Sequence, residues 1–288
     1  MLKISTETRS AASKVGEEKA IELIAKAGFD AFDLSLLSMV RYKWGENICL
    51  PCSHPFASEN AVEYVKKLRK IGEEYGIVCN QSHAPYPTYC PDVRATYAKC
   101  LELTAVAGGE ICVIHPDNFK SAEENAEMFF ELLPTAHACG VKIATENMWC
   151  WSDEKGTATD AACSDPKSFL DHIHAVNDDY LVACLDIGHA ELKGLNTSAP
   201  EMIEALGPHL QSLHIHDNDK HGDRHAIPFS DSIDFEAVAK ALKLNGYNGY
   251  LTLEAVTHLS SFAPENTLDG LAELAGSAKK LAKMIENA

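Results

Sequence analysis

The stretch Cys139-Gly140-Val141-Lys142-Ile143-Ala144-Thr145-Glu146 contains the unit from which the fold can be worked out. It follows an amphipathic run that starts near residue 121 and reads as a helix, and a glycine such as Gly140 is typical of the position directly after a helix end. Side chains alternate faces along a strand, so Val141 and Ile143 point to one side and Glu146 to the other. The stretch therefore predicts a helix, a glycine and an apolar strand that ends in an acid.

The same junction recurs after Gly76 and Gly246, and the whole chain alternates short apolar runs with longer amphipathic ones. Regular alternation of strand and helix implies a parallel sheet, and eight such units in 288 residues predict one (β/α)8 TIM barrel domain over residues 1–288. The predicted strands are 2–5, 31–36, 77–83, 111–115, 141–146, 180–186, 210–216 and 249–254. The predicted helices are 16–27, 58–75, 92–107, 121–139, 165–176, 199–206, 233–244 and 265–286.

An open, doubly wound sheet is the alternative fold. Such a sheet carries a glycine-rich phosphate loop after an early strand, and the sequence contains neither a G-x-G-x-x-G nor a Walker A pattern. The composition, with 46% hydrophobic and 23% charged residues, is ordinary for a globular enzyme with a sizeable core. The closed barrel is therefore favoured.

The net charge of −17 argues moderately against nucleic-acid binding, which depends on Lys and Arg contacts to phosphates, and against a role at a membrane surface. The amino terminus has no signal-peptide pattern, and no apolar run approaches the roughly 20 residues that span a bilayer. We therefore expect a cytoplasmic protein. Analogy with other barrels leaves a homo-oligomer open, and the sequence itself carries no signal of the oligomeric state.

The 10 cysteines show no repeated spacing, and several lie in apolar runs, where free cysteine is a common small buried residue. Cys49-Leu50-Pro51-Cys52 forms a C-x-x-C, which is a weak signal without a second pair. Ordinary loop cysteines are favoured there, and a metal or redox site is the alternative.

Ionisable side chains stand at the ends of six of the eight predicted strands. The carboxyl ends of barrel strands meet at one mouth, where the active site lies, so these side chains are predicted to converge. Strand parity agrees, because the ionisable groups in Ser212-Leu-His-Ile-His216 and Tyr250-Leu-Thr-Leu-Glu254 alternate with apolar residues that would face the helices. The side chains are His83, His115, Glu146, Asp186, His214, His216 and Glu254.

Any one of these residues alone could be a structural histidine or a solvated acid. Together they form a buried set of carboxylates and imidazoles that would repel itself unless a cation were present. We therefore predict a divalent metal ion at the mouth and leave room for more than one. Carboxylate and imidazole ligands suit Mn²⁺, Zn²⁺, Co²⁺ or Mg²⁺, and these strand ends offer no thiolate that would require zinc.

The motifs Leu185-Asp186-Ile-Gly-His189 and Leu213-His214-Ile-His-Asp-Asn218, together with Glu146 and Glu254, resemble those of the xylose isomerase-like TIM barrel superfamily. This superfamily includes ketose 3-epimerases, inosose dehydratases, hydroxypyruvate isomerase and endonuclease IV-type DNA repair enzymes. The resemblance covers essentially the whole chain. It implies that His189 contacts substrate or a second ion and that the metal ligands are Glu146, Asp186, His214 and Glu254.

The segment Asp223-Arg224-His225 also resembles this superfamily, where glycines usually stand at the place of Ser230-Asp231-Ser232. In the endonuclease branch a similar Asp-x-His supplies ligands to an additional zinc. By that resemblance Asp223, His225 and His189 are candidates for a second metal ion. A polar lid loop is the equally weighted alternative.

The predicted chemistry rests on Glu146 and Glu254. A metal would chelate a carbonyl oxygen and a neighbouring hydroxyl of a sugar-like substrate and stabilise an enediolate, while one glutamate removes the α-proton and the other returns it. The predicted reaction is a metal-dependent isomerisation or epimerisation of a sugar, a sugar phosphate or a keto-sugar. The predicted substrate contacts are His83, His115, His189, His216, Trp149, Arg224 and His225.

Three alternatives stay open. An endonuclease acting at apurinic sites would use clustered zinc ions, although the acidic composition offers little basic surface for DNA. A lyase or dehydratase acting on a keto-sugar or inosose would share the early enolate. A barrel that binds without catalysis is disfavoured by the intact pair Glu146 and Glu254.

Overall fold

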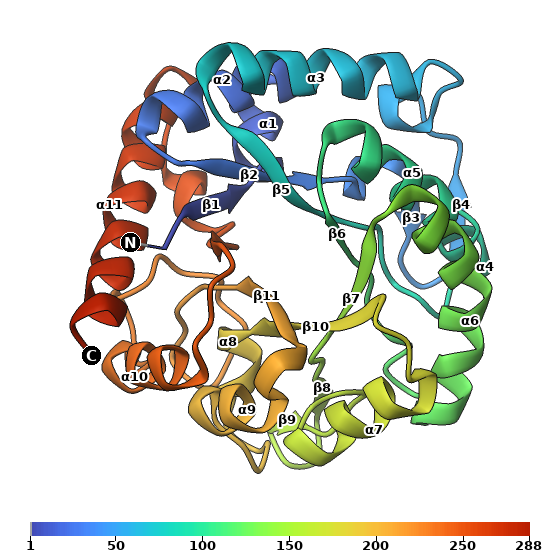
Figure 1. The fold of residues 1–288 in the computed structure, drawn as a ribbon, viewed down its shortest axis with the longest axis vertical. Helices are drawn as coiled ribbons and strands as arrows, with labels where there is room; N and C mark the ends of the chain where they lie inside the picture. Colours follow the sequence, from blue (N-terminus) through green and yellow to red (C-terminus); the bar gives the residue numbers. More distant parts are fainter. Residues whose placement is uncertain (1) are drawn as a thin grey trace.

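In the computed structural model, which describes residues 2–288, eight parallel strands form a barrel surrounded by helices (Figure 1). The strand order is β11-β10-β7-β6-β5-β2-β1-β12. The barrel closes where Ile215 N donates to Thr252 O (2.9 Å) and Glu254 N donates to Ile215 O (3.0 Å). The strands are β1 (Ile4–Glu7), β2 (Ala31–Ser35), β5 (Val78–His83), β6 (Ile111–Val113), β7 (Lys142–Glu146), β10 (Leu181–Asp186), β11 (Leu210–His214) and β12 (Leu251–Leu253).

The helices form the outer ring, and the main hydrophobic core lies between them and the outward faces of the strands (Figure 1). The predicted TIM barrel is confirmed. No helix in residues 2–288 has the length and apolar character needed to cross a membrane. The longer helices are α1 (Arg9–Val15), α2 (Glu17–Ala27), α3 (Ala61–Tyr75), α5 (Tyr97–Ala107), α6 (Ala122–Cys139), α7 (Pro166–Val176), α9 (Ala199–Leu206), α10 (Phe235–Asn245) and α11 (Thr267–Asn287). The short ones are α4 (Pro91–Arg94), α8 (Ile187–Ala190), η1 (Leu37–Met39), η2 (Pro55–Ala57), η3 (Gly207–His209), η4 (His258–Ser261) and η5 (Pro264–Asn266).

The unit that ends in β7 shows why the sequence folds in this way. Ser121 and Glu124 form a capping box that satisfies free N–H groups at the start of α6. Gly140 ends the helix in the left-handed region (φ 68°), where a glycine costs least, and its N–H donates to Ala136 O. Val141 and Ile143 are buried in the core outside the barrel, and Glu146 is buried on the opposite side, as strand parity predicted.

Beside a small apolar cluster of Val113, Ala144, Val182 and Cys184, the interior of the barrel below the mouth holds a polar network. Gln81 lies at its centre, where its Oε1 accepts from the hydroxyl of Ser212 (2.8 Å) and its Nε2 donates to Asp33 Oδ2 (3.1 Å). Ser5 and Thr252 join this network through the side chain of Asn80. A buried network with this many hydrogen bonds has few alternative arrangements, so it helps to fix the strand ends that carry the functional side chains.

Two small hairpins in the loops that follow β2 and β7 were not predicted. They are β3 (Arg41–Lys43) with β4 (Ile48–Leu50), and β8 (Cys150–Ser152) with β9 (Thr157–Thr159). Strands of three residues are too short for period-two patterning to reveal. β1 also runs to Glu7 rather than ending at Ser5, which adds an acid to the mouth. The predicted helix 92–107 is divided into α4 and α5.

Candidate active site

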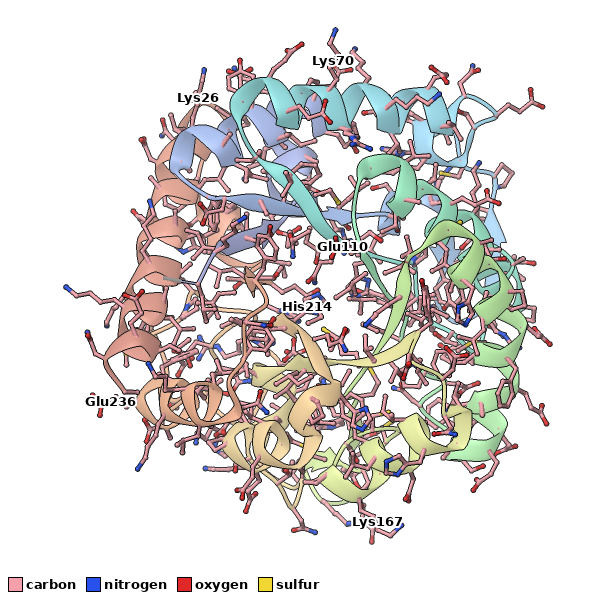
Figure 2. The ribbon with its side chains drawn as sticks, in the orientation of Figure 1. Lys26, Lys70, Glu110, Lys167, His214 and Glu236 are labelled. Carbon is pink, nitrogen blue, oxygen red and sulfur yellow. The ribbon has the colours of Figure 1, made fainter. Side chains whose placement is uncertain are left out.

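The ionisable residues predicted at the strand ends come together inside the carboxyl mouth of the barrel, and Figure 2 shows His214 at its centre. His214 Nδ1 lies 3.0 Å from Glu146 Oε1 and 3.6 Å from Glu254 Oε2. His115 Nε2 lies 3.0 Å from Glu146 Oε2 and 3.1 Å from His83 Nε2. We call His83, His115, Glu146, His214 and Glu254 the Glu146 group.

A second cluster, the His189 group, consists of His189, His216, Asp223 and His225. One nitrogen or oxygen from each of the four lies within 4.8 Å of the others. Asp223 Oδ2 is 3.2 Å from the Nε2 atoms of both His189 and His225, and Asp223 Oδ1 is 3.4 Å from His216 Nε2. His225 has left-handed backbone (φ 45°), a conformation that is uncommon outside glycine.

Asp186 lies beside the His189 group. Its Oδ1 accepts from the backbone N–H of His189 (2.7 Å) and lies 3.1 Å from His216 Nε2. Asp186 is also paired in register with His214 of the neighbouring strand, which belongs to the Glu146 group. Asp186 therefore stands between the two groups and, of the four predicted metal ligands, is the one turned toward the His189 group.

Several buried polar atoms of the site have no hydrogen-bond partner among the described residues. They lie close to groups of opposite charge but without hydrogen-bonding geometry, as Glu146 Oε2 does beside His115. Buried polar atoms without partners are costly and rare, and a bound cation would satisfy these. The donor set therefore fits a divalent metal. The atoms are Glu146 Oε2, Asp186 Oδ2, Asp223 Oδ1 and His216 Nε2.

The imidazoles are oriented as in metal sites. His83 Nδ1 donates to Ala84 O (2.8 Å), His189 Nδ1 to Asn147 O (2.9 Å) and His225 Nδ1 to Glu254 O (2.8 Å). A carbonyl oxygen only accepts, so the proton of each neutral ring lies on Nδ1 and the lone pair on Nε2. Each Nε2 points into the site, which is the arrangement that outer hydrogen bonds impose on metal-binding histidines.

The electrostatics keep the acids ionised. Burial by itself would raise the pKa of Glu146, but His214 and His115 outweigh it and hold that pKa well below its usual value. Burial is likewise outweighed by His189 and His216 at Asp186, whose pKa falls to about 2. Burial, reinforced by His115, lowers the pKa of His83. Burial is outweighed by Cys184 and Glu146 at His214 and by Asp186 and Asp223 at His189, so the pKa of each of these imidazoles lies well above its usual value. The carboxylates are thus in the form that binds a metal, whereas these two imidazoles must first lose a proton.

Two acids of the mouth were not predicted from the sequence. Asp33 Oδ2 lies 3.3 Å from His214 Nε2, so a carboxylate supports this imidazole on the side opposite Glu146. Burial raises the pKa of Glu7 to about 7, against hydrogen bonds from Ser10 and with a contribution from Glu254. The alternation of side chains along strands would have identified Glu7 in residues 4–7 and Asp33 in residues 31–35, because each acid alternates with apolar or β-branched neighbours.

Two predicted substrate contacts lie at the edge of the site. Trp149 packs beside Ala158, Leu192 and Leu195, with its ring edge toward His189 at a centroid distance of 6.4 Å. Arg224 is half exposed, and its Nη1 lies 2.8 Å from Asp231 Oδ2, away from both groups. Their roles in substrate binding stay predictions.

Steric contact explains why position 188, in the motif Asp186-Ile-Gly-His189, is a glycine. A Cβ atom built on Gly188 would overlap the ring of the fully buried His216. His216 in turn lies 3.1 Å from Asp186. The glycine therefore gives the imidazole room to approach the backbone, which places His216 against Asp186.

Replacing Gly188 with alanine is expected to lower the free energy of unfolding by about 1–3 kcal/mol, because overpacking forces a shift of a buried ring. Denaturant unfolding measures this. Gly276→Ala is the matched control, since a Cβ there meets nothing within 4 Å in the exposed part of α11, and alanine should stabilise the helix by up to about 1 kcal/mol. Equal unfolding energies for Gly188→Ala and the parent chain would contradict the packing argument.

Comparisons with known proteins agree with this architecture. Protein MJ1311 of Methanocaldococcus jannaschii, itself uncharacterised, is 26% identical over 254 residues, which cover 82% of this chain and 78% of that protein. A crystal structure of a D-tagatose 3-epimerase-like protein matches with a TM-score of 0.72 at 20% identity over 99% of both chains. The 3-keto-D-glucoside 4-epimerase YcjR of E. coli matches with a TM-score of 0.66 at 15% identity, over 96% of this chain and 100% of that one. The model of the xylose isomerase-like TIM barrel family matches residues 21–281, and the chain therefore belongs to that family.

Proposed function

We propose that this protein is a divalent-metal-dependent epimerase or isomerase that acts on a sugar or keto-sugar. The observation that carries the proposal is the pair Glu146 and Glu254, whose carboxylates flank the same nitrogen of His214 at 3.0 and 3.6 Å. Solved structures of the same fold include a 3-keto-D-glucoside 4-epimerase and a D-psicose 3-epimerase crystallised with D-tagatose. Their names support the reaction class and leave the sugar open.

Glu146, Asp186, His214 and Glu254 are the proposed metal ligands. When bound, a divalent metal supplies Lewis-acid stabilisation of the negative charge that develops on the substrate oxygens. Glu146 has an ionised carboxylate whose Oε2 lacks a hydrogen-bond partner, so it is the proposed base that takes the proton from the carbon next to the carbonyl. Glu254, whose Oε2 lies 3.6 Å from the same nitrogen of His214, is the proposed acid that returns a proton to the substrate.

The remaining histidines bind and orient the substrate in this proposal. His83 and His115 stand on the side of Glu146, and their rings meet edge-on with centroids 4.8 Å apart. A neutral His83 presents the lone pair of Nε2 and can accept a hydrogen bond from a sugar hydroxyl. Proximity of these groups to the base fixes the reacting carbon relative to Glu146.

The direct test is exchange of solvent deuterium into candidate sugars by the metal-loaded protein in D₂O. Ketoses, inososes and 3-keto sugars are screened, and the position of the label and the products are read by NMR. Label at a carbon next to the carbonyl, with an epimer or isomer as product, supports the proposal. A labelled substrate that instead loses water or splits would show a lyase, and no exchange with any sugar would contradict the proposal.

The His189 group is the proposed second metal site. Metal analysis of the purified protein is expected to give two ions per chain, and His225→Ala is expected to reduce this to one because it removes a ligand from that group alone. His137→Ala, on the surface beside Asp178, is the matched control. A parent chain with one ion would contradict the second site.

Metal binding at the His189 group is expected to release protons. Burial alone would lower the pKa of His225, but Asp223 and Glu254 raise it to about 10. His225 is therefore protonated at neutral pH in the metal-free protein. A metal must displace that proton, and its apparent affinity should rise as the pH rises from neutrality toward 10. Calorimetry in buffers of different ionisation enthalpy measures the protons released, and an affinity independent of pH would contradict this.

One observation favours a second candidate function. The His189 group holds Asp223 and His225, whose spacing resembles that of ligands to the additional zinc in the endonuclease branch. An assay on abasic duplex DNA decides between the two functions. The net charge of −17 makes cleavage the less expected result, because a DNA-binding surface needs basic residues.

A further inference from the structure

Four aromatic side chains gather on the loops beyond the carboxyl ends of the strands. We call Tyr42, Trp44, Tyr89 and Phe119 the aromatic rim. Tyr42 meets Trp44 edge-on at a centroid distance of 4.8 Å and Tyr89 at 6.5 Å, and Tyr89 lies 6.2 Å from Phe119. Trp44 is 66% exposed and Phe119 is 74% exposed. The rings thus form a continuous chain whose two ends lie largely open to solvent.

The aromatic rim is joined to the proposed catalytic centre. Tyr89 and Phe119 belong to the loops that directly follow the strand-end residues His83 and His115. Tyr86, three residues before Tyr89 in the first of these loops, stacks its ring on His115 at a centroid distance of 5.1 Å and meets His83 edge-on at 6.0 Å. The loop that holds Tyr86 against these two histidines therefore also carries Tyr89 of the rim.

The enclosed part of the site is small. The cavity bounded by His83, Tyr86, His225 and Glu254 measures about 60 Å³, which is room for about four water molecules. Sites that bury a whole ligand usually measure about 300–1,000 Å³. Most of a substrate larger than one small group must consequently lie outside this cavity.

The chemistry of the rim suits a ring that is polar at its edge and apolar on its face. The hydroxyl of Tyr42 donates to Asn47 Oδ1 (3.1 Å) and lies 3.3 Å from that of Tyr89, so polar groups border the ring faces. Aromatic faces pack against the C–H face of a sugar or against an aryl ring. Exposed apolar patches bordered by polar residues are found at ligand-binding grooves as well as at interfaces between proteins.

We propose that the aromatic rim binds the second ring of a two-ring substrate, a glycoside whose sugar ring reaches the Glu146 group. The inference rests on the proposed function and narrows its substrate class from free sugars to glycosides. The shared chemistry is a flat ring with an apolar face, supplied either by a second sugar or by an aryl aglycone.

Calorimetry with the metal-loaded protein tests this with matched probes. Methyl glycosides of glucose, galactose and mannose are compared with the corresponding phenyl glycosides and with cellobiose and lactose. For at least one sugar, the two-ring probe is expected to bind about tenfold more tightly than the corresponding methyl glycoside. Comparing the phenyl glycosides with the disaccharides shows whether the rim prefers an aryl ring or a second sugar. If no two-ring probe binds more tightly than its methyl partner, the proposal is overturned.

The variant Trp44→Ala/Phe119→Ala is expected to reduce the tenfold advantage to about twofold and to leave the methyl glycoside unchanged. Trp151→Ala is the matched control, because Trp151 is an exposed aromatic on the other hairpin. An unchanged advantage in the double variant would overturn the proposal. The proposal would also be overturned if the double variant formed smaller oligomers than the parent chain in sedimentation and bound every probe as the parent does. The rim would then be an interface between copies of the chain.

Deuterium exchange separates the two proposals. If two-ring probes bind more tightly but no sugar exchanges deuterium, the rim is a ring-binding surface and the proposed epimerase activity is contradicted. If free sugars exchange deuterium but two-ring probes bind no more tightly, the epimerase activity is supported and the role of the rim is contradicted.

Discussion

Glu146→Gln is expected to reduce the rate of deuterium exchange into the substrate by at least about 10³-fold, because general base catalysis typically contributes 10²–10⁴-fold and the variant also loses a charged metal ligand. The carboxylate is fully buried between His115 and His214, and both imidazoles favour its ionised form. Glutamine has the same shape, so the fold should persist while the base is absent. Exchange is followed by mass spectrometry on the metal-loaded variant.

The control for this variant is Glu127→Gln on the exposed face of α6, which should exchange at the parental rate. Glu254→Gln provides the second comparison, since it should impair the return of the proton and leave a base on the Glu146 side. If Glu146→Gln binds metal normally and exchanges as fast as the parent chain, Glu146 is not the base.

The sequence could predict the barrel and most of the mouth because both depend on short-range patterns. Glycines that end helices, such as Gly76, Gly140 and Gly246, and the apolar strands that follow them give the alternation. An ionisable residue at the carboxyl end of a strand must lie near the mouth. His83, Glu146 and His214 were found in this way. Their placement follows from the topology of the barrel, whatever the loops do.

The division of the site into two groups could not be predicted, because it depends on side-chain direction. His214 and His216 share one face of the sequence 212–216, yet His214 turns toward Glu146 while His216 lies under Gly188 and turns toward Asp186. Such choices depend on packing between neighbouring strands. The hairpin that carries Trp44 was missed for a related reason, since its strands of three residues have no period to read.

Removing the metal is expected to lower the melting temperature on the order of 10 °C. A ligand present at 1,000 times its Kd stabilises the folded state by about 4.1 kcal/mol, and each kcal/mol shifts the melting temperature by roughly 2–4 °C for domains of this kind. Glu146, Asp186 and Asp223 each leave a buried oxygen without a hydrogen bond when no cation is present. Calorimetric melting of chelator-treated protein, before and after Mn²⁺, Zn²⁺, Co²⁺ or Mg²⁺ is added back, measures the shift.

The metal-dependent shift should be carried by the site residues themselves. His214→Ala is expected to abolish most of it, because this imidazole is held between Glu146 and Asp33 and has no substitute on β11. His209→Ala, in η3 directly before the same strand, should leave the shift intact. A chain that melts at the same temperature with and without metal would mean that its buried acids need no cation, and the proposed chemistry at Glu146 would lose its basis.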